Sequence, residues 1–349
     1  GPGPGSRDPD WGTAARGRAK PGSDGGMPRL AVWEGTVVWT RGRFGRMIGL
    51  TMVVGMMATA GARADEARSR AEVERLIRES GAEVAVAFRT LDGRAGAPPR
   101  LELLIQPDVV FHAASTMKVP VMIELFRQDR AGLLRLDDPL PIRNEFRSIV
   151  DGSSYALSAG DDSDADIYKR LGSSMPLLEL CEAMITVSYN FATNLLIDRL
   201  DARAVQRTVR ALGADGMTVL RGVEDNKAFD AGLSNQTTAR ALMVLMERLA
   251  RLEAVDADAS RQMLEILKRQ RFNDAIPAGL PPGTVVGHKT GNITGIHHDA
   301  AIVFAERPYV LVVLVRGIED EKRSGALIAS IARVLHAESQ QIPSAAAFR

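Results

Sequence analysis

The order of apolar patterns along the chain is the feature that most restricts its fold. Val84, Val86 and Phe88 alternate with other residues, which is the period of a strand. Residues 101–110 are a second strand candidate, and three more strand-like runs come near the end of the chain, in "GTVVGHKTGN", "HDAAIVFAE" and "YVLVVLVRG". The stretches between them are mostly helical in pattern and cover residues 116–200, 202–212, 237–252 and 257–271. We therefore predict that strands from both ends of the chain pair in one sheet.

This order predicts an α/β chain of the α+β type. Its sheet is expected to be antiparallel and five-stranded, flanked by a helix over residues 65–80 and by the C-terminal helix "EKRSGALIASIARVLHAE". The sheet lobe would take residues 65–115 and 283–349, and residues 116–282 would form an all-helical lobe. A cleft between two such lobes is a natural place for a ligand.

Residues 1–64 read as a leader and not as part of the fold. Residues 1–30 are rich in Gly, Pro and Arg and have no hydrophobic period, and we predict that residues 1–46 are a disordered or untranslated leader. Residues 47–64 are an apolar run that follows three arginines and ends in Ala-Arg-Ala, the layout of a secretory signal peptide. An uncleaved anchor is the alternative, but the run is shorter than the ~20 residues of a membrane span. We expect cleavage before Asp65, a mature domain over 65–349, a periplasmic or secreted location and no stable membrane anchor.

The composition is that of an ordinary globular protein, with 45% hydrophobic residues, 25% charged residues and a net charge of +1. This balance, with no compact Lys/Arg cluster in the body of the chain, gives no reason to expect nucleic-acid binding. The single cysteine, Cys181, rules out an intrachain disulfide. It lies in an apolar, helix-like stretch, so we predict a buried and unreactive thiol.

Ser115 and Lys118 lie three residues apart at the start of the apolar run "FHAASTMKVPVMIELFR". Lysine is far rarer than arginine in this chain, and lysine, unlike arginine, can lose its proton when it is desolvated. At a helix start Ser115 would meet unpaired backbone N–H groups, and Lys118 would lie one turn on along the same face. Serine needs an adjacent base to become a nucleophile. The alternative is an N-cap serine beside a solvated lysine.

A second polar cluster interrupts the helical pattern of "MITVSYNFATNLLID". The break falls at Ser188, Tyr189 and Asn190, because Ser and Asn bond to nearby backbone and are weak helix formers. A short turn there would present a hydroxyl and an amide. The alternative is a plain corner between two helices, with a capping serine.

A third cluster lies in the strand-like segment "VVGHKTGNITG". Lys289 adds positive charge, the hydroxyl of Thr290 can bind a carboxylate, and Gly291 allows close approach of another backbone. The alternative is an edge strand in which Lys289 is a gatekeeper against aggregation.

The three motifs S-x-x-K, S-x-N and K-T-G, in this order, resemble those of the class A serine β-lactamases and their penicillin-binding relatives. The resemblance covers essentially residues 65–340. It implies that Ser115 attacks a lactam carbonyl, that Lys118 acts as the base in acylation or orients the groups, and that Ser188 relays a proton to the leaving nitrogen. It also implies a small-molecule partner, a β-lactam or a peptidoglycan stem peptide, with no cofactor, no metal and a monomeric protein.

The resemblance further implies how a substrate is held. Asn190 would bind the amide side chain of the substrate, and Lys289 with Thr290 would hold its carboxylate. The oxyanion hole would consist of the backbone N–H groups of Ser115 and Asn292, the residue after Gly291.

Two features depart from the class A pattern. Tyr189 stands where the middle motif normally has an aspartate, so the turn must be held in another way. The loop over residues 221–236 offers Glu224 as the residue that activates water for deacylation, but the asparagine expected four residues later is absent and Asn226 is the nearest. Either the loop is rearranged, or Asp225 or Lys227 shares the task, or the loop is merely a charged surface.

An arginine that often binds the substrate carboxylate has no counterpart after the K-T-G strand, where His297 and His298 stand instead. The pair is a candidate replacement, and a metal site there lacks a third ligand at a sensible spacing. The functional alternatives to a β-lactamase are a D-alanyl-D-alanine carboxypeptidase or esterase, a slowly deacylating penicillin-binding sensor, and an inert homologue.

Overall fold

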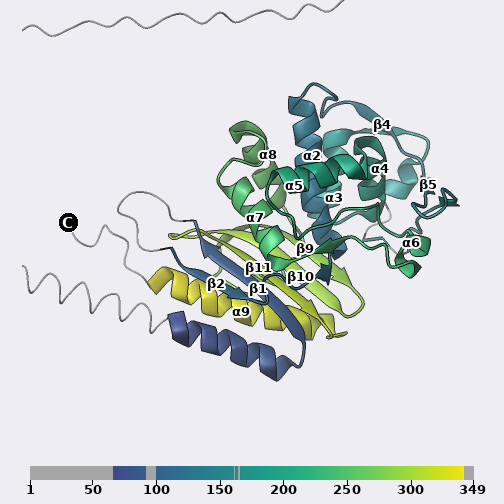
Figure 1. Cartoon of the computed structure of the whole chain (residues 1–349). Helices are drawn as coiled ribbons and strands as arrows, with labels where there is room; N and C mark the ends of the chain where they lie inside the picture. Colours follow the sequence, from purple (N-terminus) through teal and green to yellow (C-terminus); the bar gives the residue numbers. More distant parts are fainter. Residues whose placement is uncertain (1–65, 92–99, 161, 164–165, 342–349) are drawn as a thin grey trace, which may run out of the picture. The chain divides into compact units, whose positions relative to one another are not determined.

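A five-stranded antiparallel sheet forms the centre of the computed structural model, which describes residues 66–91, 100–160, 162–163 and 166–341. The strands lie in the order β2-β1-β11-β10-β9, as Figure 1 shows. Their bounds are β1 Glu83–Thr90, β2 Glu102–Ile105, β9 Val285–Ile293, β10 Ile296–Phe304 and β11 Tyr309–Arg316. Strand β1 pairs with β11, so the two ends of the chain meet in one sheet as predicted.

The side chains of each central strand alternate between two apolar layers, because successive residues of a strand face opposite sides. In β1, Val84 and Val86 belong to one buried cluster, whereas Ala85 and Ala87 belong to the other. Strand β11 is almost wholly buried along its length. Its sequence is therefore a continuous apolar run, which is typical of a strand covered on both faces.

The first and last described helices cover one face of the sheet (Figure 1). They are the helix over residues 66–80 and α9, Glu321–Gln341. Val73 from the first helix and Ile328 and Leu335 from α9 pack with the outward-facing valines of β1. The predicted flanking by N- and C-terminal helices is confirmed.

The central helices pack into a second apolar cluster on the opposite face of the sheet. It includes Met122 of α2, Leu180 of α3, Leu196 of α4 and Leu242 of α7. The helices of this part are α2 Lys118–Arg130, α3 Leu177–Thr186, α4 Asn190–Leu200, α5 Ala202–Ala211, α7 Ala239–Ala250 and α8 Ala257–Leu267. Cys181 is fully buried among them, and burial raises the pKa of its thiol well above the usual value.

Short elements connect the helices and add detail that the sequence patterns lack. Three two-stranded ladders pair β3 Phe111–His112 with β8 Gln236–Thr237, β4 Pro139–Pro141 with β7 Ser174–Pro176, and β5 Phe146–Arg147 with β6 Ser154–Tyr155. The 3₁₀ turns are η1 Ala114–Met117, η2 Asp166–Arg170 and η3 Pro277–Gly279. The predicted loop over 221–236 contains a short helix, α6 Asn226–Asp230, and ends in β8.

The leader and signal-peptide predictions for residues 1–64 lie outside the described residues. In the ranges that the structure does describe, no helix is both long enough and apolar enough to cross a membrane. The division of the mature chain into lobes at residues 115 and 283 stays a prediction.

Candidate active site

Ser115 lies in the 3₁₀ turn η1, directly before helix α2, which begins at Lys118. The residue before the serine, Ala114, has a positive φ of 45°. Pro120 falls in the first turn of α2, where its missing N–H removes no intrahelical hydrogen bond. The 3₁₀ turn before α2 brings Ser115 to the edge of a pocket.

Lys118 is fully buried, so it is not the solvated lysine of the alternative interpretation. Its Nζ lies 2.7 Å from the carbonyl oxygen of Ser188, 3.1 Å from Ser188 Oγ and 2.8 Å from Asn190 Oδ1. The first two motifs therefore meet through this one nitrogen. Because α3 ends at Thr186 and α4 begins at Asn190, the break between the two helices is what turns the serine and the asparagine toward Lys118.

Lys289 brings the third motif to the same point. Its Nζ donates to Ser188 Oγ at 3.0 Å and to its neighbour's carbonyl, Thr290 O, at 2.8 Å. Although β9 is an edge strand of the sheet, the side chain of Lys289 is fully buried and faces the helices. The hydroxyl of Ser188 thus lies between two lysine amines.

Burial has the largest effect on the pKa of both amines, because desolvation penalises a charged group. It lowers the pKa of Lys118 to about 7, against the attraction of the carboxylates of Asp162 and Glu224, which raises it. Burial also lowers the pKa of Lys289 well below its usual value, and the nearby charge of Lys118 lowers it further, whereas Asp299 raises it. An amine with a pKa near 7 is able to take up a proton at neutral pH.

Gly291 lets strand β9 come close to the serine. A Cβ at this position would lie 3.2 Å from Ser115 N, 3.2 Å from Ala114 Cβ and 3.1 Å from Thr116 Cγ2. These contacts are tighter than most contacts of a Cβ, so a side chain here would press on the turn η1. The absence of a side chain at residue 291 therefore allows the close approach of β9 to the Ser115 N–H group.

Replacing Gly291 with alanine is expected to displace this N–H and to lower kcat/KM for a chromogenic β-lactam about 10²-fold, the effect of losing one oxyanion donor. The matched control is Gly287→Ala on the same strand, where a Cβ meets nothing closer than 3.4 Å. Equal rates for the two variants would remove the argument for a close approach at Gly291.

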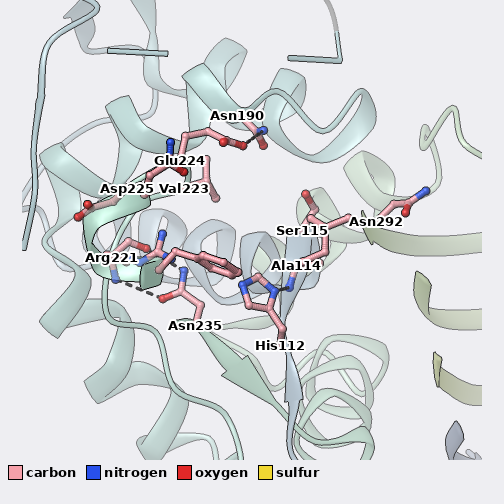
Figure 2. Close-up of a pocket in the computed structure, with 13 residues that line it drawn as sticks. His112, Ala114, Ser115, Asn190, Arg221, Val223, Glu224, Asp225, Asn235 and Asn292 are labelled. Carbon is pink, nitrogen blue, oxygen red and sulfur yellow. Dashed lines mark hydrogen bonds between the residues drawn. The ribbon is translucent and has the colours of Figure 1, made fainter. Parts of the chain in front are cut away.

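Glu224 lies across the pocket from Ser115 and beside Asn190, as Figure 2 shows. Asn190 Nδ2 donates to Glu224 Oε1 at 3.1 Å. The backbone of Glu224 has a positive φ of 60°, a conformation that costs free energy for a residue other than glycine and is common at functional sites. A chain of contacts therefore runs from Lys118 through the amide of Asn190 to the carboxylate of Glu224.

The two residues considered as substitutes for Glu224 are occupied elsewhere. Asp225 is buried, and its carboxylate accepts from Ser148 Oγ at 2.9 Å, Ile149 N at 3.0 Å and Ala228 N at 3.1 Å. It caps α6 and ties down the loop. Lys227 is exposed and pairs with Asp151 at 3.0 Å. The structure therefore places Glu224, and neither of these neighbours, beside the motif residues.

The cleft consists of two adjoining pockets that share Ser115, Asn190 and Asn292. One has a volume of about 230 Å³ and runs toward Glu224 and His112. The other has a volume of about 340 Å³ and runs past Thr290 toward β10 and α9. Ser115 lies where the two meet, so a ligand seated across it would reach both sides of the cleft.

The two histidines after the K-T-G strand point in different directions. His298 is fully buried, and its Nε2 lies 2.9 Å from the carbonyl oxygen of His112. His297 lines the larger pocket, with its Nδ1 2.8 Å from Ser324 Oγ. The pair therefore does not act together in the cleft. Among the residues whose placement is described, no group of three or more His, Cys, Asp or Glu is arranged to hold a metal ion.

Several polar residues of the cleft were not anticipated from the sequence. Arg221, Asn235 and His112 line the smaller pocket, and Asn235 Nδ2 donates to Arg221 O at 2.9 Å, which closes the base of the loop. Asp162 lines the larger pocket and contacts the start of α4. Asp162 belongs to the polar, acidic segment over 151–166, and nothing in the composition of that segment distinguishes it from its acidic neighbours.

Residues 68–338 match the sequence model of the β-lactamase enzyme family. The chain belongs to the β-lactamase enzyme family. This family member is 30% identical to a β-lactamase of Streptomyces albus G over 80% of its own length and 88% of that protein. It is also 31% identical to the carbapenem-hydrolysing β-lactamase KPC of Klebsiella oxytoca, over 59% of its own length and 68% of that enzyme.

Solved structures give the same assignment for this β-lactamase family member. It superimposes on PBP-A with a TM-score of 0.66 and 26% identity, over 79% of its own length and 97% of PBP-A. A variant of PBP-A solved as an acyl-enzyme complex with penicillin G gives a TM-score of 0.65 and 27% identity, over 79% of this chain and 97% of that one. The family member is therefore a serine hydrolase of the β-lactamase type, with the predicted fold.

Proposed function

We propose that this protein is a class A β-lactamase that hydrolyses β-lactams through an acyl-enzyme on Ser115. The observation that carries the proposal is the contact chain from Lys118 through Asn190 to Glu224. An acyl-enzyme must be attacked by water, and a carboxylate held across the pocket from the nucleophile is the group suited to activate that water.

Acylation begins with the transfer of the Ser115 proton to Lys118. A neutral Lys118 has two N–H donors, which Ser188 O and Asn190 Oδ1 accept. Its lone pair is then left to act as a base. The N–H groups of Ser115 and Asn292 stabilise the tetrahedral oxyanion. Ser188, between the two lysines, passes the proton to the lactam nitrogen as the C–N bond breaks.

The substrate carboxylate binds at the Lys289 and Thr290 end of the cleft. A bound carboxylate raises the pKa of Lys289, which burial has lowered, so the substrate itself favours the charged ammonium. Asn190 Nδ2 lies beside Glu224, where it binds the amide side chain of the substrate. Deacylation follows when Glu224 takes a proton from water as that water attacks the ester carbonyl; the bond from the acyl carbon to Ser115 Oγ then breaks, and Ser115 Oγ takes up a proton.

The rate of acylation is expected to depend on pH through Lys118. The neutral amine is the active form, and burial places its pKa near 7. The acylation rate constant therefore rises about tenfold per pH unit below 7 and levels off above it. The rising part of this pH profile, its acid limb, is measured by stopped-flow acylation between pH 5 and pH 9. An acylation rate that is flat across this range would contradict the role of Lys118 as base.

Three substrates separate the proposed function from its alternatives. The proposed enzyme turns over a chromogenic cephalosporin many times. Release of D-alanine from a peptidoglycan peptide, without lactam turnover, would identify a carboxypeptidase. A stoichiometric burst with penicillin G and no turnover would identify a penicillin-binding sensor, and no adduct at all would identify an inert homologue.

We also propose that the protein is exported by a signal peptide over residues 47–64 and acts as a monomer in the periplasm or outside the cell. The support is the sequence layout before Asp65. N-terminal sequencing of the exported protein is expected to begin at Asp65, and light scattering is expected to give the mass of one chain. An exported form that retains residues 47–64 would show an anchor instead.

A further inference from the structure

We propose that Asp162 is a positioning residue of the active site, which holds the turn of the S-x-N motif from a separate loop. Class A members carry an aspartate inside this motif, and this chain has Tyr189 there. The inference rests on the proposed acylation of Ser115 and deepens it, because it names the group on which the arrangement around Lys118 depends.

Both oxygens of Asp162 accept hydrogen bonds from the first backbone N–H groups of α4. Asn190 N donates to Oδ1 at 2.8 Å, and Phe191 N donates to Oδ2 at 2.9 Å. These donors have no acceptor within the helix, so a carboxylate there satisfies two groups at once and lies at the positive end of the helix dipole. Asp162 is thus the cap that the sequence around residue 189 does not provide.

Tyr189 itself does not cap the helix through its side chain. It is the N-cap residue of α4, but its side chain makes no capping hydrogen bond. The residue is 8% exposed and packs in the apolar cluster of the helices. An aromatic residue at this position therefore contributes to the core, and the carboxylate comes from a segment more than twenty residues earlier in the chain.

The loop that carries Asp162 is tied to α4 by other contacts. Tyr168 Oη donates to Asp162 Oδ2 at 3.2 Å. The ring of Tyr168 stacks on Phe191, with 4.7 Å between centroids and 13° between planes. Ser163 Oγ donates to the carbonyl oxygen of Val187, directly before Ser188. The loop therefore holds the motif from both of its ends.

The position of this turn decides the contacts of the catalytic groups. Ser188 has a positive φ of 60°, which is unfavourable unless the surrounding structure fixes it. Both Ser188 and Asn190 bind Lys118 Nζ. A shift of the turn would move these partners away from the amine, and a displacement of about 1 Å costs about 10²-fold in rate.

Asp162 also acts on Lys118 through its charge. The charged groups that face this amine are Asp162, Glu224 and Lys289, from three different segments. The carboxylate of Asp162 raises the pKa of Lys118 against the effect of burial. Removing the charge is therefore expected to lower that pKa and to move the acid limb of acylation to lower pH.

The test is Asp162→Asn, which keeps the shape of the side chain but replaces one acceptor oxygen with a donor. We expect the amides of Asn190 and Phe191 to exchange with solvent at least about tenfold faster. Stopped-flow acylation by penicillin G is expected to fall about 10²-fold at its plateau, with its acid limb at lower pH. The pKa of Lys118, read from lysine ¹³Cε shifts, is expected to fall as well.

The matched control is Asp166→Asn, which removes an equal charge from the same loop at a site that pairs with Lys169 on the surface. The proposal would be overturned if Asp162→Asn and Asp166→Asn had the same amide exchange rates and the same Lys118 pKa. Acylation of Asp162→Asn at the wild-type rate would overturn it as well.

A merely structural cap would lower the melting temperature without moving the acid limb of acylation. If the wild type is not acylated, the proposed function fails, and amide exchange and the lysine titration still decide the role of Asp162.

Discussion

The Ser115→Ala variant is expected to lose acylation by penicillins completely and to lower kcat for a chromogenic β-lactam by at least about 10⁴-fold. The reason is that no other nucleophile is held at the junction of the two pockets that meet at Ser115, as far as the described residues show. The fold should be unaffected, because the exposed side of the 3₁₀ turn loses only an oxygen atom. Intact-protein mass spectrometry and steady-state kinetics measure both parts of the expectation.

The control for this variant is Ser330→Ala, in which the lost hydroxyl bonds only to Ala326 O on the surface of α9. It is expected to keep the wild-type rate. Residual turnover of Ser115→Ala above about a hundredth of the wild-type rate would place the nucleophile elsewhere.

The Glu224→Gln variant is expected to form an acyl-enzyme that accumulates. Deacylation should slow by about 10²–10⁴-fold, the contribution of a general base. The introduced side-chain amide can still accept from Asn190, whose contact with Glu224 spans 3.1 Å. Acylation persists, with its acid limb at lower pH, because the charge of Glu224 raises the pKa of Lys118 in the native protein. A quench time course with mass detection separates the two steps.

Glu145→Gln is the matched control for the loss of a carboxylate, since Glu145 pairs with Arg147 on the surface. It should deacylate like the wild type. Unchanged deacylation in Glu224→Gln would show that another group activates water. The loop that contains Glu224 would then only line the pocket.

The sheet and its flanking helices were predictable because their signals are local and repeated. The strands of residues 285–316 have apolar runs separated by turns that contain glycine or proline, and no helix period competes with them. Two features indicated the motifs: the rarity of lysine, and the break in the helical pattern at Ser188. Both reflect chemistry that overrides ordinary propensity.

Other features depend on contacts between distant segments, which a single sequence does not encode locally. The short ladders pair strands of two or three residues, too short for a period to be visible. The cap that Asp162 provides joins residues 162 and 190, and only the folded chain distinguishes that aspartate from its acidic neighbours. The separation of His297 from His298 follows from the alternation of neighbouring residues on β10, so the strand pattern alone predicts it.

The proposed reaction depends on an ester that forms at Ser115 and is then hydrolysed. The most direct measurement is time-resolved mass spectrometry of residues 65–349 mixed with penicillin G, followed by digestion to locate the adduct. We predict an adduct with the mass of the intact penicillin, located on the peptide that contains Ser115, which decays with the release of penicilloic acid. An adduct on another residue, or no adduct in the wild type and in Glu224→Gln, would contradict the account.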